Sequence, residues 1–167
     1  MKYLSICLFF IFTSVNLYAG NNDEIKAIKS GLVRAVQSSK ATDSLYTKLV
    51  SKKSEDALII AYIGTLEALK AKHAWNPYNK IKFVAQSQST MKTAIKKDAD
   101  NLEIRFMRFS IQHFTPAFLG YSKELAEDQK AIVNHFVTKS FGNADKLLIK
   151  SIADFMLKSK RCSASEV

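Results

Sequence analysis

Two arginines and a glutamine lie close together on one predicted helix. Arg105, Arg108 and Gln112 fall within roughly 60° of one another when successive residues are placed about 100° apart. The chain holds only four arginines, and the residues around this pair are mostly large and apolar. A guanidinium group on a largely buried helix needs hydrogen-bond acceptors.

The acceptors of the two arginines can be internal or external. An internal acceptor would make the pair part of the fold. An external acceptor would be an acidic group of a partner, held in a groove as peptide-binding repeats hold carboxylates. The candidate internal acceptors are Glu67, Glu103, Glu124, Glu127 and Asp128.

A second candidate binding region holds the only tryptophan of the chain. His73, Trp75 and Tyr78 flank Asn76-Pro77, a residue pair typical of a helix start. An aromatic, polar connection between two helices can close one end of a binding groove. The alternative is structural, with Trp75 packed over the end of the helix pair and Asn76 capping the second helix.

The sequence shows no catalytic or metal-binding pattern. The histidines at 73, 113 and 135 lack the close spacing that metal ligands on one helix need. There is no glycine-rich phosphate loop and no nucleophile elbow. Glu124, Glu127 and Asp128 share a predicted helix face with lysines beside them, which favours a solvated or ion-paired face. We therefore expect a protein that is not an enzyme and has no cofactor and no metal.

The first 19 residues have the three parts of a secretory signal peptide. A basic start at Lys2 precedes an apolar run over residues 4–15, and small residues follow at Ala19-Gly20. The run is shorter than the roughly 20 residues that span a bilayer. We predict cleavage after Ala19 and a periplasmic or secreted protein with no stable membrane span. The alternative is an uncleaved membrane anchor.

The composition is typical of one folded domain. The chain has 167 residues, of which 47% are apolar and 24% charged, with five glycines and two prolines. We expect the domain to cover residues 20–160 and residues 161–167 to form a disordered tail. After cleavage Cys162 is the one remaining cysteine, which leaves a free thiol or a pairing between two chains.

Apolar residues recur at helical spacing through nearly the whole chain, which predicts an all-α antiparallel array of six or seven helices. They are expected at about residues 25–36, 45–50, 55–72, 77–97, 102–114, 122–138 and 144–159. The first should be capped within residues 21–23. The helix at 55–72 carries a stripe of small residues around Gly64, so another helix should approach closely there and this helix should be central.

Residues 55–112 resemble a tetratricopeptide repeat. Ile63-Gly64 in an alanine-rich helix is similar to the first helix of such a repeat. The segment 94–101 is similar to its ending, with Ala99 where proline is usual. The resemblance implies helix pairs that each bury one face against the next. Segments 74–78, 101–112 and 116–121 also resemble a group of small secreted bacterial helical proteins, which implies the same fold class and compartment but no activity.

The formal net charge of +10 comes mainly from lysine. Export argues against nucleic acid as the partner, whereas acidic proteins, anionic glycans and lipid headgroups all fit this charge. We expect a non-enzymatic interaction module or accessory factor of the bacterial envelope, which binds an envelope protein or an acidic peptide segment. The alternative is a carrier of a small apolar ligand or lipid. Its pocket would be lined by Phe106, Phe109, Phe114 and Phe118.

Overall fold

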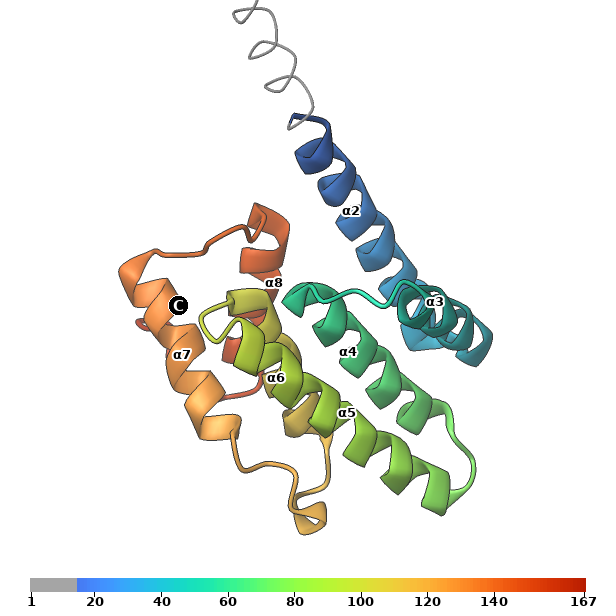
Figure 1. The fold of residues 1–167 in the computed structure, drawn as a ribbon. Helices are drawn as coiled ribbons and strands as arrows, with labels where there is room; N and C mark the ends of the chain where they lie inside the picture. The colour runs from blue at the N-terminus through green and yellow to red at the C-terminus, as the bar shows by residue number, and fades with distance from the viewer. Residues whose placement is uncertain (1–14) are drawn as a thin grey trace, which may run out of the picture.

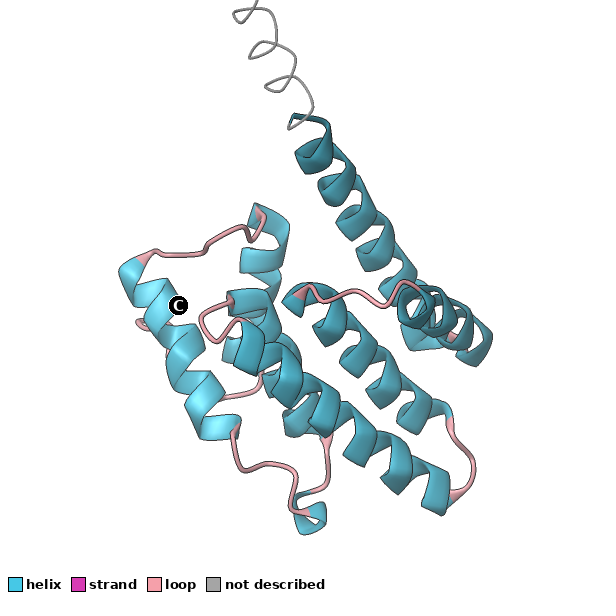
Figure 2. Cartoon of the chain, viewed as in Figure 1, coloured by secondary structure: helices cyan, strands magenta, loops and turns pink. Residues whose placement is uncertain are grey.

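The computed structural model describes residues 15–167, and this part of the chain is helical without any strand (Figure 2). The all-α prediction with six or seven helices is confirmed. The elements in chain order are α2 (Val15–Gln37), α3 (Ser39–Ser51), α4 (Ala57–His73), α5 (Pro77–Lys97), α6 (Leu102–Phe114), the short 3₁₀ helix η1 (Ala117–Leu119), α7 (Leu125–Thr138) and α8 (Lys146–Lys158).

The predicted leader lies mostly outside the described residues. Residues 1–14 are not described, and α2 already begins at Val15. The expected cap within residues 21–23 is therefore wrong, because α2 continues through these residues as one helix (Figure 1). None of the helices in the described part is long and apolar enough to cross a membrane.

Helix α4 is central, as its small-residue stripe predicts. It packs against α2, α3, α5 and α6, and it runs antiparallel to α5 (Figure 1). The approach of α5 is closest at Gly64, where a Cβ would lie 2.8 Å from Met91 Sδ. The hydroxyl of Ser87 also donates to the Gly64 carbonyl over 2.7 Å. The absence of a side chain at position 64 therefore permits this contact.

Local capping residues fix most helix starts. Asp56, Asn76 and Asn101 each accept hydrogen bonds from backbone N–H groups in the first turn of α4, α5 and α6. The start of α3 differs from the prediction. It is capped by Ser38, and Thr42 lies buried inside the helix with its hydroxyl donating to the Ala35 carbonyl over 2.8 Å.

Two clusters of buried side chains form the core. One lies among α2, α3, α4 and α5, and the other among α6, α7 and α8. Helix α6 belongs to both, because Ile104 and Met107 pack in the first cluster whereas Leu102 and Phe109 pack in the second. This double burial explains why its sequence is so apolar.

Part of the C-terminal tail packs against the protein, although most residues of 161–167 are exposed. Cys162 and Val167 lie against the second cluster, and the side chain of Gln129 donates to the Arg161 carbonyl. The tail folds back because its two apolar side chains gain burial there. Cys162 is a half-buried free thiol in this structure.

Candidate functional site

The arginine pair of α6 faces α7. The Arg108 guanidinium donates from Nε to Asp128 Oδ2 over 2.6 Å and from Nη2 to Asp128 Oδ1 over 2.7 Å. Arg105 donates from Nη1 to the same Oδ1 over 2.9 Å and from Nε to the Ala99 carbonyl over 2.7 Å. Both arginines also pair with Glu127. The side-chain acceptors of both arginines are therefore internal. They are Glu127 and Asp128, two of the five acidic residues considered from the sequence.

The charges of the two arginines are balanced by those of Glu127 and Asp128. Asp128 is fully buried and Arg108 is 5% exposed. Burial alone lowers the pKa of Arg108, but the hydrogen bonds and charge of Asp128 outweigh it and raise that pKa. The hydrogen bond from Arg105 lowers the pKa of Glu127. Two cations face two carboxylates, so the cluster offers little free charge to a partner.

Gln112 completes this buried face. Its side-chain amide donates to Gln88 Oε1 over 3.0 Å and to Glu124 Oε2 over 2.8 Å, and it is 1% exposed. Arg105, Arg108 and Gln112 thus lie on one face of α6, as predicted. Their hydrogen bonds join α6 to α5 and to α7 with the residue before it. Their side-chain donors are used within the fold, as the internal alternative requires.

His73 contributes to the fold as well. Its Nε2 lies 2.9 Å from the Ala35 carbonyl, and the neighbouring Lys72 donates to the Val36 carbonyl over 2.7 Å. These carbonyls end α2 and have no partner of their own within the helix. His73 and Lys72 therefore tie the end of α4 to the end of α2.

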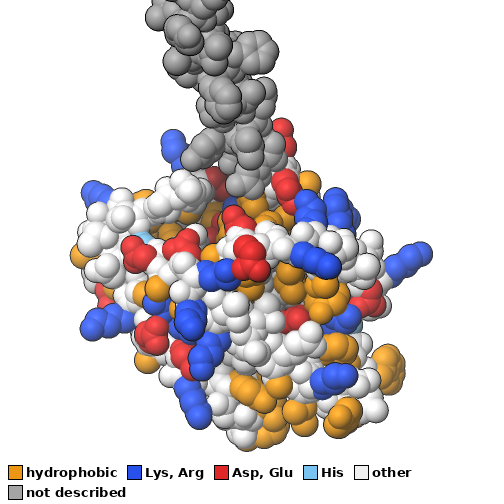
Figure 3. Space-filling view, viewed as in Figure 1, with side chains coloured by type: hydrophobic (Ala, Val, Ile, Leu, Met, Phe, Trp, Pro, Cys, Tyr) orange, Lys and Arg blue, Asp and Glu red, His pale blue; other side chains and the backbone are white. Residues whose placement is uncertain are grey.

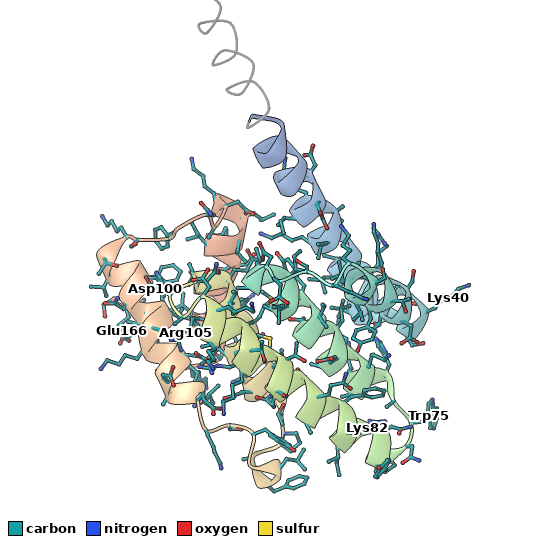
Figure 4. The ribbon with its side chains drawn as sticks, viewed as in Figure 1. Lys40, Trp75, Lys82, Asp100, Arg105 and Glu166 are labelled. Carbon is teal, nitrogen blue, oxygen red and sulfur yellow. The ribbon has the colours of Figure 1, made fainter. Side chains whose placement is uncertain are left out.

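Trp75 stands in solvent. It is 98% exposed, and Tyr78 is 73% exposed on the first turn of α5. The structural alternative for Trp75, packing over the helix ends, is wrong. The connection between α4 and α5 is only residues 74–76, with Asn76 used as the cap of α5. Figure 4 shows Trp75 directed away from the helices.

We call residues 70–82 the α4–α5 tip; they comprise the end of α4, the connection and the start of α5. The tip belongs to a stretch of unusual charge. Residues 68–97 contain seven lysines and no aspartate or glutamate. Lys80 and Lys82 are exposed and form no ion pair with the residues that the structure describes. In Figure 3 apolar side chains gather along the lower edge of the molecule, where Figure 1 places both the segment around η1 and, at the lower right, the tip.

An open cleft of about 340 Å³ lies beside the tip. Its two charged side chains are Lys70 and Asp43. The Lys70 ammonium lies 3.3 Å from Asp43 and over the ring of Tyr46, 4.3 Å from the ring centroid. Sequence reasoning missed this cleft because its wall comes from α3, α4 and α5 together. The lining residues are Ser39, Thr42, Asp43, Lys70, His73, Ala74, Asn79 and Phe83.

The four phenylalanines proposed for a carrier do not share a cavity. Phe106 and Phe109 pack edge-on against Phe155, with ring centroids 5.3 and 6.1 Å apart. Phe114 is 75% exposed and Phe118 is 86% exposed. Phe114 also packs edge-on against Phe155, with ring centroids 5.8 Å apart, so Phe155 occupies the space among the first three rings.

The three histidines lie in different places. His73 binds the end of α2, His113 stacks on Phe109, and His135 lies 2.5 Å from the Ser140 carbonyl. Among residues 15–167 no group of three or more His, Cys, Asp or Glu side chains is placed to hold a metal ion.

Comparison of the chain with known protein families, with characterised proteins and with solved structures finds no significant match. The residues and geometry of the chain itself are therefore the basis for assigning a function.

Proposed function

We propose that the protein is a non-enzymatic interaction module that binds a negatively charged partner through the α4–α5 tip. The observation that carries this proposal is the combination of an almost fully exposed Trp75 with a stretch of 30 residues, 68–97, that has lysines and no acidic residue. Exposed tryptophan and tyrosine are costly in a free protein surface and frequent where partners bind.

The charge around the tip supports an anionic partner. Lys80 and Lys82 are free to contact it, and Lys40 projects from α3 on the same side of the molecule (Figure 4). Attraction of this kind is weak for each lysine and sensitive to salt. The predicted leader favours an envelope partner, so we propose a periplasmic or secreted protein whose mature chain begins at Gly20. N-terminal sequencing of the exported protein tests that start.

The interaction module is favoured over a carrier of an apolar ligand. The cleft beside the tip is open, and its two charged side chains, Lys70 and Asp43, are paired with each other. The phenylalanines that would line a carrier pocket are packed on Phe155 or exposed.

Affinity capture from envelope extract tests the proposal. The wild-type protein is compared with Lys80→Gln/Lys82→Gln, and with Lys130→Gln/Lys158→Gln as a control of equal charge change on α7 and α8. We expect capture of an acidic or anionic component at low salt, its loss at high salt, and its loss from the tip variant alone. Equal capture by all three proteins would contradict the role of the tip.

A further inference from the structure

We infer that the anionic partner of the α4–α5 tip is a phospholipid surface. The inference rests on the proposed function and names the partner of the same site. It is drawn from three features of the tip: its convex shape, the kind of apolar side chain it exposes, and the position of its lysines.

The tip protrudes from the edge of the molecule, so it can contact a flat surface. Residues 74–76 join two antiparallel helices at the edge of the molecule, and Trp75 extends beyond them (Figures 1 and 4). A peptide partner would need a groove in which to lay its side chains. The exposed aromatic side chains are outside the neighbouring cleft, whose wall includes only Phe83 as an aromatic residue. A flat partner therefore fits the tip better than an extended chain.

The exposed apolar groups suit the depth of lipid headgroups. Indole and phenol rings have an apolar body and one polar end, and they concentrate at membrane interfaces for that reason. Tyr78 and Ile81 are one helical turn apart on α5 and are 73% and 48% exposed. With Trp75 they give a small apolar surface at the very end of the hairpin.

The lysines stand where they would meet phosphate groups. Lys82 is four residues after Tyr78 on the same face of α5, whereas Lys80 lies on the opposite face within the same turn. Both side chains lean toward the N-terminus of α5, and hence toward the tip. A lysine extends its ammonium toward water while its methylene stem lies along apolar surface. The tip thus combines an apolar anchor with basic residues, two signals that together hold a protein reversibly on an anionic membrane surface.

Trp75 is a built-in reporter, because it is the only tryptophan of the chain. Its emission is followed while vesicles of equimolar phosphatidylglycerol and phosphatidylcholine are added, and again with phosphatidylcholine alone. We expect a blue shift with the anionic vesicles, reversed by salt, and little change with the neutral ones. The shift reports the surroundings of Trp75 itself, so lipid binding by the N-terminal leader does not produce it.

Substitutions measure how much the lysines and the apolar side chains of the tip each contribute to lipid binding. Each basic residue near an anionic surface contributes about 1 kcal/mol, which is about fivefold in affinity. Lys80→Gln/Lys82→Gln should therefore raise the lipid concentration at half-shift about thirtyfold, whereas Lys130→Gln/Lys158→Gln should leave it within about twofold. Tyr78→Ser should also weaken binding, and Leu147→Ser, an exposed apolar residue of α8, should not.

A parallel titration uses a synthetic peptide of glutamates around one phenylalanine. If the peptide shifts Trp75 emission through Lys80 and Lys82 while anionic vesicles do not, the lipid inference is overturned and the proposed function stands. If neither probe acts on Trp75, both are overturned. An equal shift with neutral vesicles would also overturn the inference, because the lysines would then have no role.

Discussion

Asp128 is the residue on which the α6–α7 contact depends. It is fully buried and receives hydrogen bonds from both Arg105 and Arg108. A buried carboxylate without a cation is far less stable than a paired one. The arginines that first suggested a binding site are thus required by the charge that α7 buries.

Replacement of Arg108 by methionine should be strongly destabilising. Arg108→Met keeps much of the apolar stem but leaves Asp128 with one cation in place of two. We expect a loss of about 3 kcal/mol in unfolding free energy, the lower end of the range for broken buried pairs, since Arg105 remains. Arg161→Met, in the tail, should change it by less than about 0.5 kcal/mol. Denaturant unfolding measures both, and equal stability of the two variants would refute the structural role.

Glu67 is a second buried acid, with a different environment. Its Oε1 accepts hydrogen bonds from Gln86 over 2.7 Å and from Tyr46 over 3.4 Å, and its Oε2 is also buried. Burial raises the pKa of Glu67 above its ordinary value of 4.5. The folded state therefore holds this proton at pH values where the unfolded chain has released it.

Because the pKa of Glu67 is raised in the folded state, the stability of the protein should decrease as pH rises. The contribution of Glu67 to stability is full below pH 4.5 and is lost as pH rises through the folded-state pKa. Glu67→Gln should remove that loss. Melting temperatures from pH 4 to neutral pH should fall more for wild type than for Glu67→Gln. Parallel curves for the two proteins would show that the carboxyl does not titrate as its burial requires.

At the scale of elements, the α4–α5 hairpin is fixed by one close contact. The side chain of Met91 fills the space that a Cβ at position 64 would need, and its backbone nitrogen is 3.4 Å from that point. A small group can be accommodated if the thioether moves, but a branched side chain cannot.

Substitutions at Gly64 test this packing. Gly64→Leu should cost about 1–3 kcal/mol by overpacking. Gly64→Ala should not give the gain of about 1 kcal/mol that alanine brings at an exposed helical glycine, because Met91 must shift. Denaturant unfolding of the two variants gives the answer, and a Leu variant as stable as wild type would show that α5 does not approach α4 so closely.

Elements with local signals were predictable from the sequence. Asp56, Asn76 and Asn101 sit next to the helices that they cap, so their role can be read within a few residues. Helix α3 begins at Ser39, earlier than the expected residue 45, and Thr42 lies inside it. In the fold its hydroxyl binds the carbonyl of Ala35, seven residues earlier.

The candidate site was only partly predictable. The helical spacing of Arg105 and Arg108 correctly placed both on one face, but the choice of Asp128 as acceptor depends on how α7 packs. Trp75 and Tyr78 were predicted as binding residues, and their exposure leaves that prediction in place. The cleft around Lys70 could not be predicted, because it is assembled from three helices. The likeness to tetratricopeptide repeats stays a prediction.

At the scale of the whole molecule, charge is unevenly divided between the ends of the α4–α5 hairpin. The tip end has Lys80 and Lys82 free, whereas the other end carries Glu55, Asp56 and Asp98 around a cleft of about 530 Å³, with Lys97 paired to Glu55. Unpaired positive charge at one end of a protein favours an approach to an anionic surface with that end first. For this protein that end carries Trp75.

Collisional quenching of Trp75 by acrylamide tests the binding role of the tip most directly. We expect strong quenching in the free protein, as for an indole in water, because the side chain is 98% exposed. Adding anionic vesicles at low salt should protect it, and the Lys80→Gln/Lys82→Gln variant should stay unprotected. Weak quenching of the free protein, or equal protection of wild type and variant, would contradict a binding tip built from Trp75 and these lysines.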